Sequence, residues 1–455
     1  MKPFKILSPT AILGYGFPEA SFLKGMEEKP DLIAVDAGST DPGPYYLGSG
    51  KSFTDRVGVK RDLRYMLTHG VKNKIPVVIG SAGGSGARPH VDWCRQIIEE
   101  IALEEKLSFR MGIAYADIEK AAVIKAIDGG QVTPLDDLPM PTAEEVNSCP
   151  HIVAQMGIEP IRALLNEGVD VILAGRAYDP VCFSALPIMK GYDVALATHM
   201  GKIIECAAIA ATPGSGADAV LGILHQDYFV LKALNPTRKF TELSAAAHSL
   251  YEKSDPYHLP GPGGTLDLSN VTFTELETGE VEVRGTTIAP TNPYRIKLEG
   301  SSPVGFRTIS IAGTHDPIMI ASLDNILVEV KARVDDLLSK ENVEAKVFFH
   351  VYGKHGVMGD LEKGEYPDPH EAGILIEVLA PTQEAADTVC SITRSTLLHY
   401  GYEGRIATAG NLAFPFSPSD IRMGQSYQFT LYHLMDAPDP LAPFKREIVS
   451  VGGAK

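Results

Sequence analysis

Two carboxylates, Asp36 and Asp41, stand five residues apart, directly after the short apolar run 32–35. Such a run is typical of a buried parallel strand, and the loop after it also holds Ser39 and several glycines. Open α/β sheets bind ligands at the carboxyl ends of their strands, where small residues expose backbone N–H groups. Two carboxylates at this spacing can also share a hard cation such as Mg²⁺. The alternative is a Gly/Pro-rich turn in which both aspartates make local hydrogen bonds.

A glycine-rich segment, residues 80–90 (GSAGGSGARPH), lies between an apolar run and a stretch with helical spacing. Its spacing does not fit the GxGxxG dinucleotide fingerprint, and residues 48–52 do not complete a P-loop. A strand-to-helix junction of this composition still suits a nest of backbone N–H groups for an anion. We therefore expect Ser81, Gly83 and Gly84 to contact a ligand, with a flexible turn as the alternative.

Arg176 follows a third apolar run, 169–174, and is expected at the same sheet edge as Asp36. The guanidinium fork matches a substrate carboxylate or phosphate. The alternative is a structural ion pair of Arg176 with Asp179 or Asp36.

His315 and His355 follow predicted strands in the second half of the chain and are flanked by glycines. Imidazole titrates near neutral pH, so both are candidates for general acid/base catalysis, although a single histidine is more often structural. His90 and Asp92 form a weaker metal-binding pair, for which a role at a helix N-terminus is the better interpretation.

The composition excludes several classes of partner. The chain has 455 residues and a net charge of −16, from 57 acidic and 41 basic residues. Such a surface repels nucleic acid and anionic lipid, so we expect neither nucleic acid nor membrane as a partner. Five scattered cysteines form no CxxC pair, and no run approaches a membrane span or a signal peptide. These features predict a cytoplasmic protein.

The order of apolar runs predicts an α/β fold. In the first half, expected strands alternate with expected helices, which indicates a mostly parallel sheet flanked by helices. After about residue 235, short alternating segments and two long helical stretches indicate an α+β domain. We therefore expect domains at 1–235, with the glycine-rich ligand loops, and at 236–455, contributing to the same cleft. Among the expected strands are 194–198, 294–298 and 306–312.

Several of these motifs together resemble the acyclic terpene utilization (AtuA) family. They are the segment from Asp36 to Pro44, the Gly83-Gly84 turn, the segment Gly175 to Asp179, and the late segments 402–405 and 415–420. The resemblance covers residues from about 5 to about 440. It implies a role in the bacterial catabolism of branched acyl compounds. Larger relatives have an extra C-terminal domain, which we do not expect in this chain.

The residues and the resemblance together lead to an enzyme of small carboxylic acid or acyl-CoA catabolism, a lyase of the hydratase/dehydratase type. Arg176 would hold a carboxylate, and His315 or His355 would move a proton beside the carbonyl. A divalent cation such as Mg²⁺ on Asp36 and Asp41 remains open as a cofactor, and a homo-oligomer is expected. The alternatives are a metal-dependent hydrolase of an amide or thioester, and a non-catalytic subunit that binds a ligand or a partner.

Overall fold

A computed structural model describes residues 2–135, 137–251, 255–341, 343–364 and 366–453. The chain divides into two compact units, one of residues 1–302 and 429–455 and the other of residues 303–428. The chain therefore leaves the first unit once and returns to it. This division differs from the boundary expected near residue 235, because strands β12 (Thr272–Glu275) and β13 (Val281–Arg284) still belong to the large sheet of the first unit.

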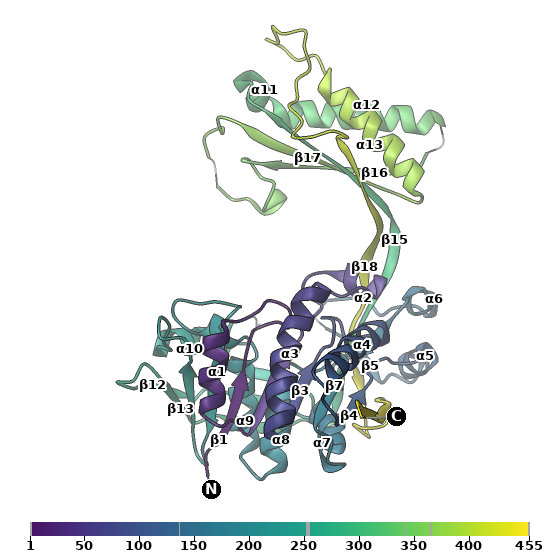
Figure 1. Ribbon diagram of the computed structural model, residues 1–455. Coiled ribbons are helices and arrows are strands. Elements are labelled where there is room, and N and C mark those ends of the chain that lie inside the picture. The colour runs from purple at the N-terminus through teal and green to yellow at the C-terminus, as the bar shows by residue number, and fades with distance from the viewer. Residues whose placement is uncertain (1, 136, 252–254, 342, 365, 454–455) are drawn as a thin grey trace. The chain divides into compact units, whose positions relative to one another are not determined.

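A ten-stranded mixed sheet forms the centre of the first unit (Figure 1). Its strands, in spatial order, are β12 (Thr272–Glu275), β13 (Val281–Arg284), β9 (Phe229–Ala233), β8 (Val220–Leu224), β1 (Phe4–Ser8), β2 (Leu32–Asp36), β3 (Val77–Gly80), β7 (Val171–Ala174), β4 (Phe109–Ala114) and β19 (Arg446–Val451). The five strands from β1 to β4 in this order are parallel, and the flanking strands pair antiparallel. The expected parallel strands are therefore present within a mixed sheet.

Helices cover both faces of this sheet, as the alternation of strands and helices predicts. The helices of the first unit are α1 (Glu19–Glu27), α2 (Pro44–Ser49), α3 (Arg56–Asn73), α4 (Arg88–Glu104), α5 (Lys120–Asp128), α6 (Ala143–Ser148), α7 (Ile158–Asn166), α8 (Val181–Met189), α9 (Val194–Ile204), η1 (Ala207–Ala210) and α10 (Glu242–Leu250). One core packs α1, α3 and α4 on one face, and a second core packs α7, α8 and α9 on the other. Alternate residues of the central strands enter each core: Ile33 and Val35 enter the first, and Leu32 and Ala34 the second.

Two smaller sets of strands complete the first unit. One is a three-stranded sheet of β10 (His258–Gly261), β11 (Gly264–Asp267) and β14 (Thr287–Pro290). The other consists of β5 (Val132–Pro134) and β6 (Ile152–Ala154), which pair with β18 (Asp420–Asp436) and β15 (Arg295–Thr314) respectively. Strands β15 and β18 each contribute residues to both units.

The second unit is an α+β layer with its own core. Strands β16 (Lys346–Tyr352) and β17 (Ala372–Ala380) join β15 and β18 in its sheet, together with α11 (Pro317–Ala321), α12 (Leu323–Glu341), η2 (Gly359–Leu361) and α13 (Gln383–Leu398). Residues of β17 alternate strictly between buried and half-buried, which indicates that only one face of the sheet is packed against helices.

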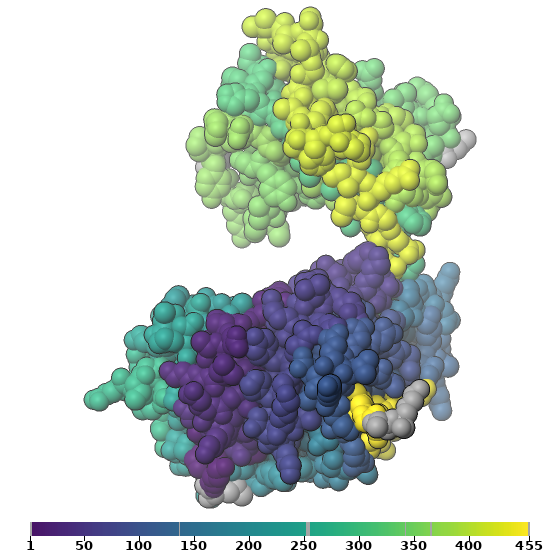
Figure 2. Space-filling model, viewed as in Figure 1, coloured from purple at the N-terminus to yellow at the C-terminus, as the bar shows by residue number. Residues whose placement is uncertain are grey.

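One expected strand is wrong. The apolar run 194–198 is the start of helix α9, because the Asp193 carboxylate accepts a hydrogen bond from the Leu196 N–H and caps the helix. The strands expected at 294–298 and 306–312 are present, but residues 295–298 and 306–312 are parts of one continuous strand, β15. Residues near the C-terminus, yellow in Figure 2, reach the surface of the first unit. The last strand, β19, pairs antiparallel with β4. Among the described residues, no helix is long and apolar enough to cross a membrane.

Candidate functional site

Three loops meet at one edge of the large sheet, where parallel strands β2, β3 and β7 end. Asp36 pairs with Gly80 across β2 and β3, and the Ser81 and Ala82 N–H groups donate to the carbonyls of Gly175 and Ala174. The expectation that loops 36–43, 80–86 and 175–179 share one edge is therefore confirmed.

Glycines allow the backbone and side chains at this edge of the sheet to lie close together. Gly86 has a φ of +67°, and a Cβ there would lie 2.0 Å from the backbone nitrogen of Arg176. A Cβ on Gly80 would lie 2.2 Å from Cys182 Sγ and 3.0 Å from Asp36 Oδ1. Larger residues at either position would push the loops apart.

Arg176 is almost completely buried and bonds to protein groups. Its Nε donates to Glu299 Oε2 at 2.8 Å, and its Nη1 donates to Ser81 Oγ and Asp179 Oδ1, both at 3.2 Å. Burial alone would raise the pKa of Glu299, but the charges of Arg176 and Lys297 outweigh burial and lower it. The structural pairing of Arg176 with Asp179 is therefore present, and Glu299 is a further partner that the sequence pattern did not indicate.

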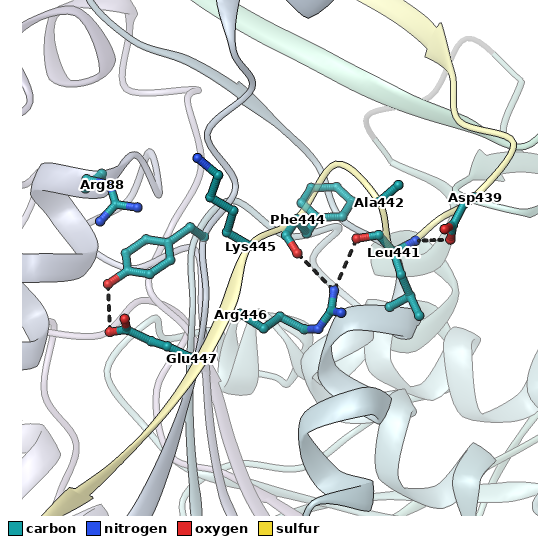
Figure 3. Close-up of a pocket in the computed structure, with 9 residues that line it drawn as sticks. Arg88, Asp439, Leu441, Ala442, Phe444, Lys445, Arg446 and Glu447 are labelled. Atoms are coloured by element: carbon teal, nitrogen blue, oxygen red, sulfur yellow. Dashed lines mark hydrogen bonds between the residues drawn. The ribbon is translucent and has the colours of Figure 1, made fainter.

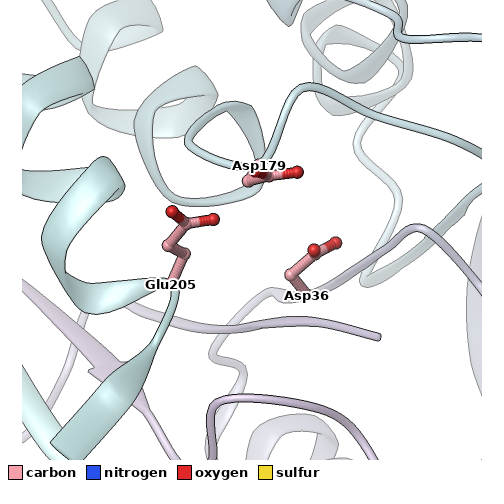
Figure 4. Close-up of side chains that lie close together, drawn as sticks. All are labelled: Asp36, Asp179 and Glu205. Atoms are coloured by element: carbon pink, nitrogen blue, oxygen red, sulfur yellow. The ribbon is translucent and has the colours of Figure 1, made fainter. Parts of the chain in front are cut away.

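Three carboxylates come together beside Arg176: Asp36, Asp179 and Glu205, here called the acidic cluster (Figure 4). One oxygen from each lies within 4.8 Å of the others. Asp36 ends β2, Asp179 lies in the turn between β7 and α8, and Glu205 is the C-cap of α9. Asp36 and Glu205 are buried, and Asp179 is partly exposed.

The carboxylates of the acidic cluster lie close together and are largely removed from water, and both effects act on their pKa values. Burial raises the pKa of Asp36 well above its usual value, the charge of Asp179 adds to this, and Arg176 opposes it. Burial likewise raises the pKa of Glu205, although Lys202 Nζ lies 2.6 Å from Glu205 Oε1. Asp36 Oδ1 is buried and has no hydrogen-bond partner among the described residues.

A pocket of about 800 Å³ opens beside the acidic cluster, and its lining belongs entirely to the first unit. The lining residues are Ser39, Asp41, Leu135, Gln155, Arg176, Tyr178, Asp179, Pro260–Pro262, Thr291–Pro293, Arg295, Lys297, Tyr432 and Leu434. Asp179 and Arg176 therefore belong both to the pocket wall and to the buried network behind it. The volume lies within the range of small-molecule sites.

The remaining predicted ligand residues have different surroundings. Ser39 lines the pocket and accepts a hydrogen bond from the Asp41 N–H; Asp41 is exposed on the pocket wall and is not a member of the acidic cluster. Ser81 supports Arg176, as described above. Gly83 and Gly84 contact protein, since their added Cβ atoms would meet His90 and Phe53.

His90 is a buried structural residue. Its Nε2 lies 3.1 Å from the carbonyl of Tyr46 and 2.9 Å from that of Lys51, and burial lowers its pKa. Asp117 and Asp179 stand shortly before helices α5 and α8, where a carboxylate often caps a helix, but the N-cap residues are Glu119 and Pro180. Instead, Asp117 accepts a hydrogen bond from the Arg88 N–H at the start of α4, and Asp179 joins the acidic cluster.

His315 and His355 belong to the second unit. His315 is exposed after β15, with its ring 5.9 Å from that of His370. His355 Nε2 lies 2.8 Å from Asp324 Oδ1. Their end-of-strand positions are as predicted, and their catalytic role stays a prediction.

Glu205 is the residue of the acidic cluster that the sequence interpretation missed. The sequence predicts a strand where α9 begins, and the helix that Glu205 caps is therefore not expected. The signal was present in Asp193, a good N-cap residue directly before the apolar run.

A second hollow, of about 660 Å³, lies near the end of β4 (Figure 3). Arg88 stacks 4.0 Å above the Tyr115 ring, the Tyr115 hydroxyl donates to Glu447, and Arg446 bonds to the carbonyls of Leu441 and Phe444. Tyr115 thus interacts with Arg88 and Glu447, whereas Arg446 bonds to the backbone. Within the described part of the chain, this hollow has no cluster of three acids like that beside the first pocket.

The family model of the acyclic terpene utilisation family protein AtuA matches residues 55–219 and 227–415. The chain belongs to this family. Membership associates it with the utilisation of acyclic terpenes. The matched ranges contain Arg176, Asp179, Glu205 and Glu299, whereas Asp36 precedes them. No functionally curated protein and no solved structure matches the chain.

Proposed function

We propose that the chain is an enzyme of branched acyl catabolism that adds water to, or removes it from, a small carboxylic acid or acyl-CoA. The main support for this proposal is that Asp179 both lines the pocket and belongs to the acidic cluster. A substrate in the pocket would thus meet a carboxylate whose surroundings are desolvated. Such surroundings are typical of groups that move protons in active sites.

The pocket wall supplies groups of the right kind for this substrate. Arg176, Arg295 and Lys297 contribute positive charge that suits a carboxylate or a thioester oxygen. Leu135, Leu434 and three prolines, Pro260, Pro262 and Pro293, contribute apolar surface for a branched hydrocarbon. In dehydration, the proton beside the carbonyl leaves to a base, its electron pair forms the double bond, and the hydroxyl departs as water after gaining a proton. Asp179 is our candidate for one of these proton transfers.

The test is an assay in oxygen-18 water with a panel of branched unsaturated acids and their CoA thioesters. We expect one of them to gain a labelled hydroxyl group, detected by mass spectrometry. Asp179→Asn should lower the rate at least about 100-fold, because general acid/base groups contribute about 10²–10⁴-fold. Asp128→Asn neutralises an exposed carboxylate at the end of α5 and should retain full activity. If no member of the panel gains a labelled hydroxyl, the hydratase proposal is wrong.

A metal-dependent hydrolase is the second candidate, favoured by the three convergent carboxylate oxygens of the acidic cluster. The same assay separates the two functions. A hydrolase would release free thiol and place the label in the carboxylate product, and chelation of metal would stop it.

A further inference from the structure

We infer that the acidic cluster binds one hard divalent cation through Asp36, Asp179 and Glu205, and that Asp41 takes no part. This deepens the proposed function, on which it rests for the role of the cation but not for its binding. The sequence paired Asp36 with Asp41, whereas the structure brings Asp36 together with Asp179 and Glu205.

The spacing of the oxygens suits such an ion. One oxygen from each carboxylate lies within 4.8 Å of the others. Two oxygens bound to Mg²⁺ at about 2.1 Å can be at most about 4.2 Å apart, and at Ca²⁺ distances of about 2.5 Å they can be about 5 Å apart. The acidic cluster could therefore hold a larger ion as it stands, and Mg²⁺ after a small closure.

An unpartnered oxygen provides a second, independent observation. Asp36 is 5 % exposed, and its Oδ1 has no hydrogen-bond partner in the part of the chain that the structure describes. A buried acceptor without a partner is costly, and such groups in native proteins call for an explanation such as an ion. The Asp36 carboxylate lies close to those of Asp179 and Glu205 (Figure 4), so a cation bound between them would satisfy it.

The charges around the acidic cluster would be balanced better by one more positive charge. Besides the acidic cluster, the network contains Glu299, and its cations are Arg176, Lys202 and Lys297. With all groups ionised, four carboxylates therefore face three cations among the residues of this network that the structure describes. A negative charge kept away from water is stabilised by a bound cation or is neutralised by a proton.

Asp179 gives the site access to the pocket. Because Asp179 lines the pocket, a cation on the acidic cluster would lie at the pocket wall and keep coordination positions open for substrate oxygen or water. In the proposed reaction it would hold the hydroxyl or carbonyl oxygen as a Lewis acid. It adds no redox step.

The test is Mn²⁺ binding to the full chain after treatment with EDTA and desalting, followed by electron paramagnetic resonance of free Mn²⁺. We expect one Mn²⁺ per chain, displaced by Mg²⁺ or Ca²⁺. Asp36→Asn and Glu205→Gln should each weaken binding at least tenfold, whereas Asp41→Asn and the exposed-site control Asp128→Asn should bind like the wild type.

Thermal unfolding guards against misfolded variants. Mn²⁺ should raise the melting temperature of the wild type and of Asp128→Asn, but not of Glu205→Gln. The metal-free melting temperature of Glu205→Gln should be lower than that of the wild type, because the buried Lys202 loses its charged partner, and a cooperative transition shows that the variant is folded. No stoichiometric Mn²⁺ binding, or binding that Asp36→Asn and Glu205→Gln leave intact, would overturn the inference. Hydration activity that persists in EDTA would overturn the role of the cation alone, and metal binding without hydration activity would overturn the proposed function alone.

Discussion

The buried ionisable side chains of the first unit differ in how their loss of hydration is compensated. Glu299 is neutralised by Arg176 and Lys297, whereas Asp36 Oδ1 has no hydrogen-bond partner among the residues that the structure describes. His199 is buried as a neutral ring. It lies on α9, the helix that ends beside Glu205. Its Nδ1 lies 2.7 Å from Thr286 Oγ1 and its Nε2 3.0 Å from Ser249 Oγ, and burial lowers its pKa to about 3.

His199 therefore predicts a loss of stability in acid. Its folded pKa lies below the unfolded value near 6.5, so its contribution is complete above pH 6.5 and falls as the pH drops toward about 3. This group alone adds a slope of about 1.4 kcal/mol per pH unit to the free energy of unfolding below pH 6. His199→Gln should reduce the acid slope, measured by urea unfolding between pH 5.5 and 4.

A control for this experiment is His258→Gln. The pKa of His258 is raised by Asp255, so both folded and unfolded chains are protonated at this residue below about pH 5.5. The control should keep the wild-type acid slope. An unchanged slope in His199→Gln would contradict the neutral, buried state of His199.

At the level of elements, the site depends on loops that touch through glycine. Gly86→Ala should destabilise the chain and lower activity, because its Cβ would overlap the backbone of Arg176 at 2.0 Å. Gly130→Ala is the matched control, since Gly130 has nearly the same φ of +68° but nothing within 4 Å of its Cβ. The control should lose only about 1–2 kcal/mol from the left-handed backbone. Equal losses in urea unfolding for the two variants would contradict the close contact.

The elements also show what could be predicted from sequence. The runs ending at Asp36, Gly80 and Ala174 were identified as strands because β-rich apolar runs bounded by glycine are a strong local signal. Helix α9 was missed because a five-residue apolar run fits a buried strand as well as a helix. Its C-cap residue, Glu205, therefore could not be placed beside Asp36, and neither could Glu299 beside Arg176, because long-range contacts depend on the tertiary fold.

At the scale of the whole molecule, two units with separate cores divide the candidate residues. The pocket and the acidic cluster belong to the first unit, and His315 and His355 belong to the second. If the second unit supplies proton transfer, His315→Ala or His355→Ala should lower turnover at least about 100-fold. Mn²⁺ binding by the first unit should stay at the wild-type level, as measured by electron paramagnetic resonance. Full turnover in both variants would restrict catalysis to groups of the first unit.

The central claim is that the acidic cluster serves function and not stability. Asp36→Asn tests it most directly, because it removes one charge while keeping the side-chain volume. Turnover of the substrate found in the oxygen-18 assay should be measured on this variant and on the wild type with Mg²⁺ present, and the melting temperature of both should be measured without added metal. We predict that turnover falls at least about 100-fold while the melting temperature is unchanged or higher, since an amide relieves carboxylate crowding and can donate to Asp179 or Glu205. A lower melting temperature with full specific activity would contradict the account.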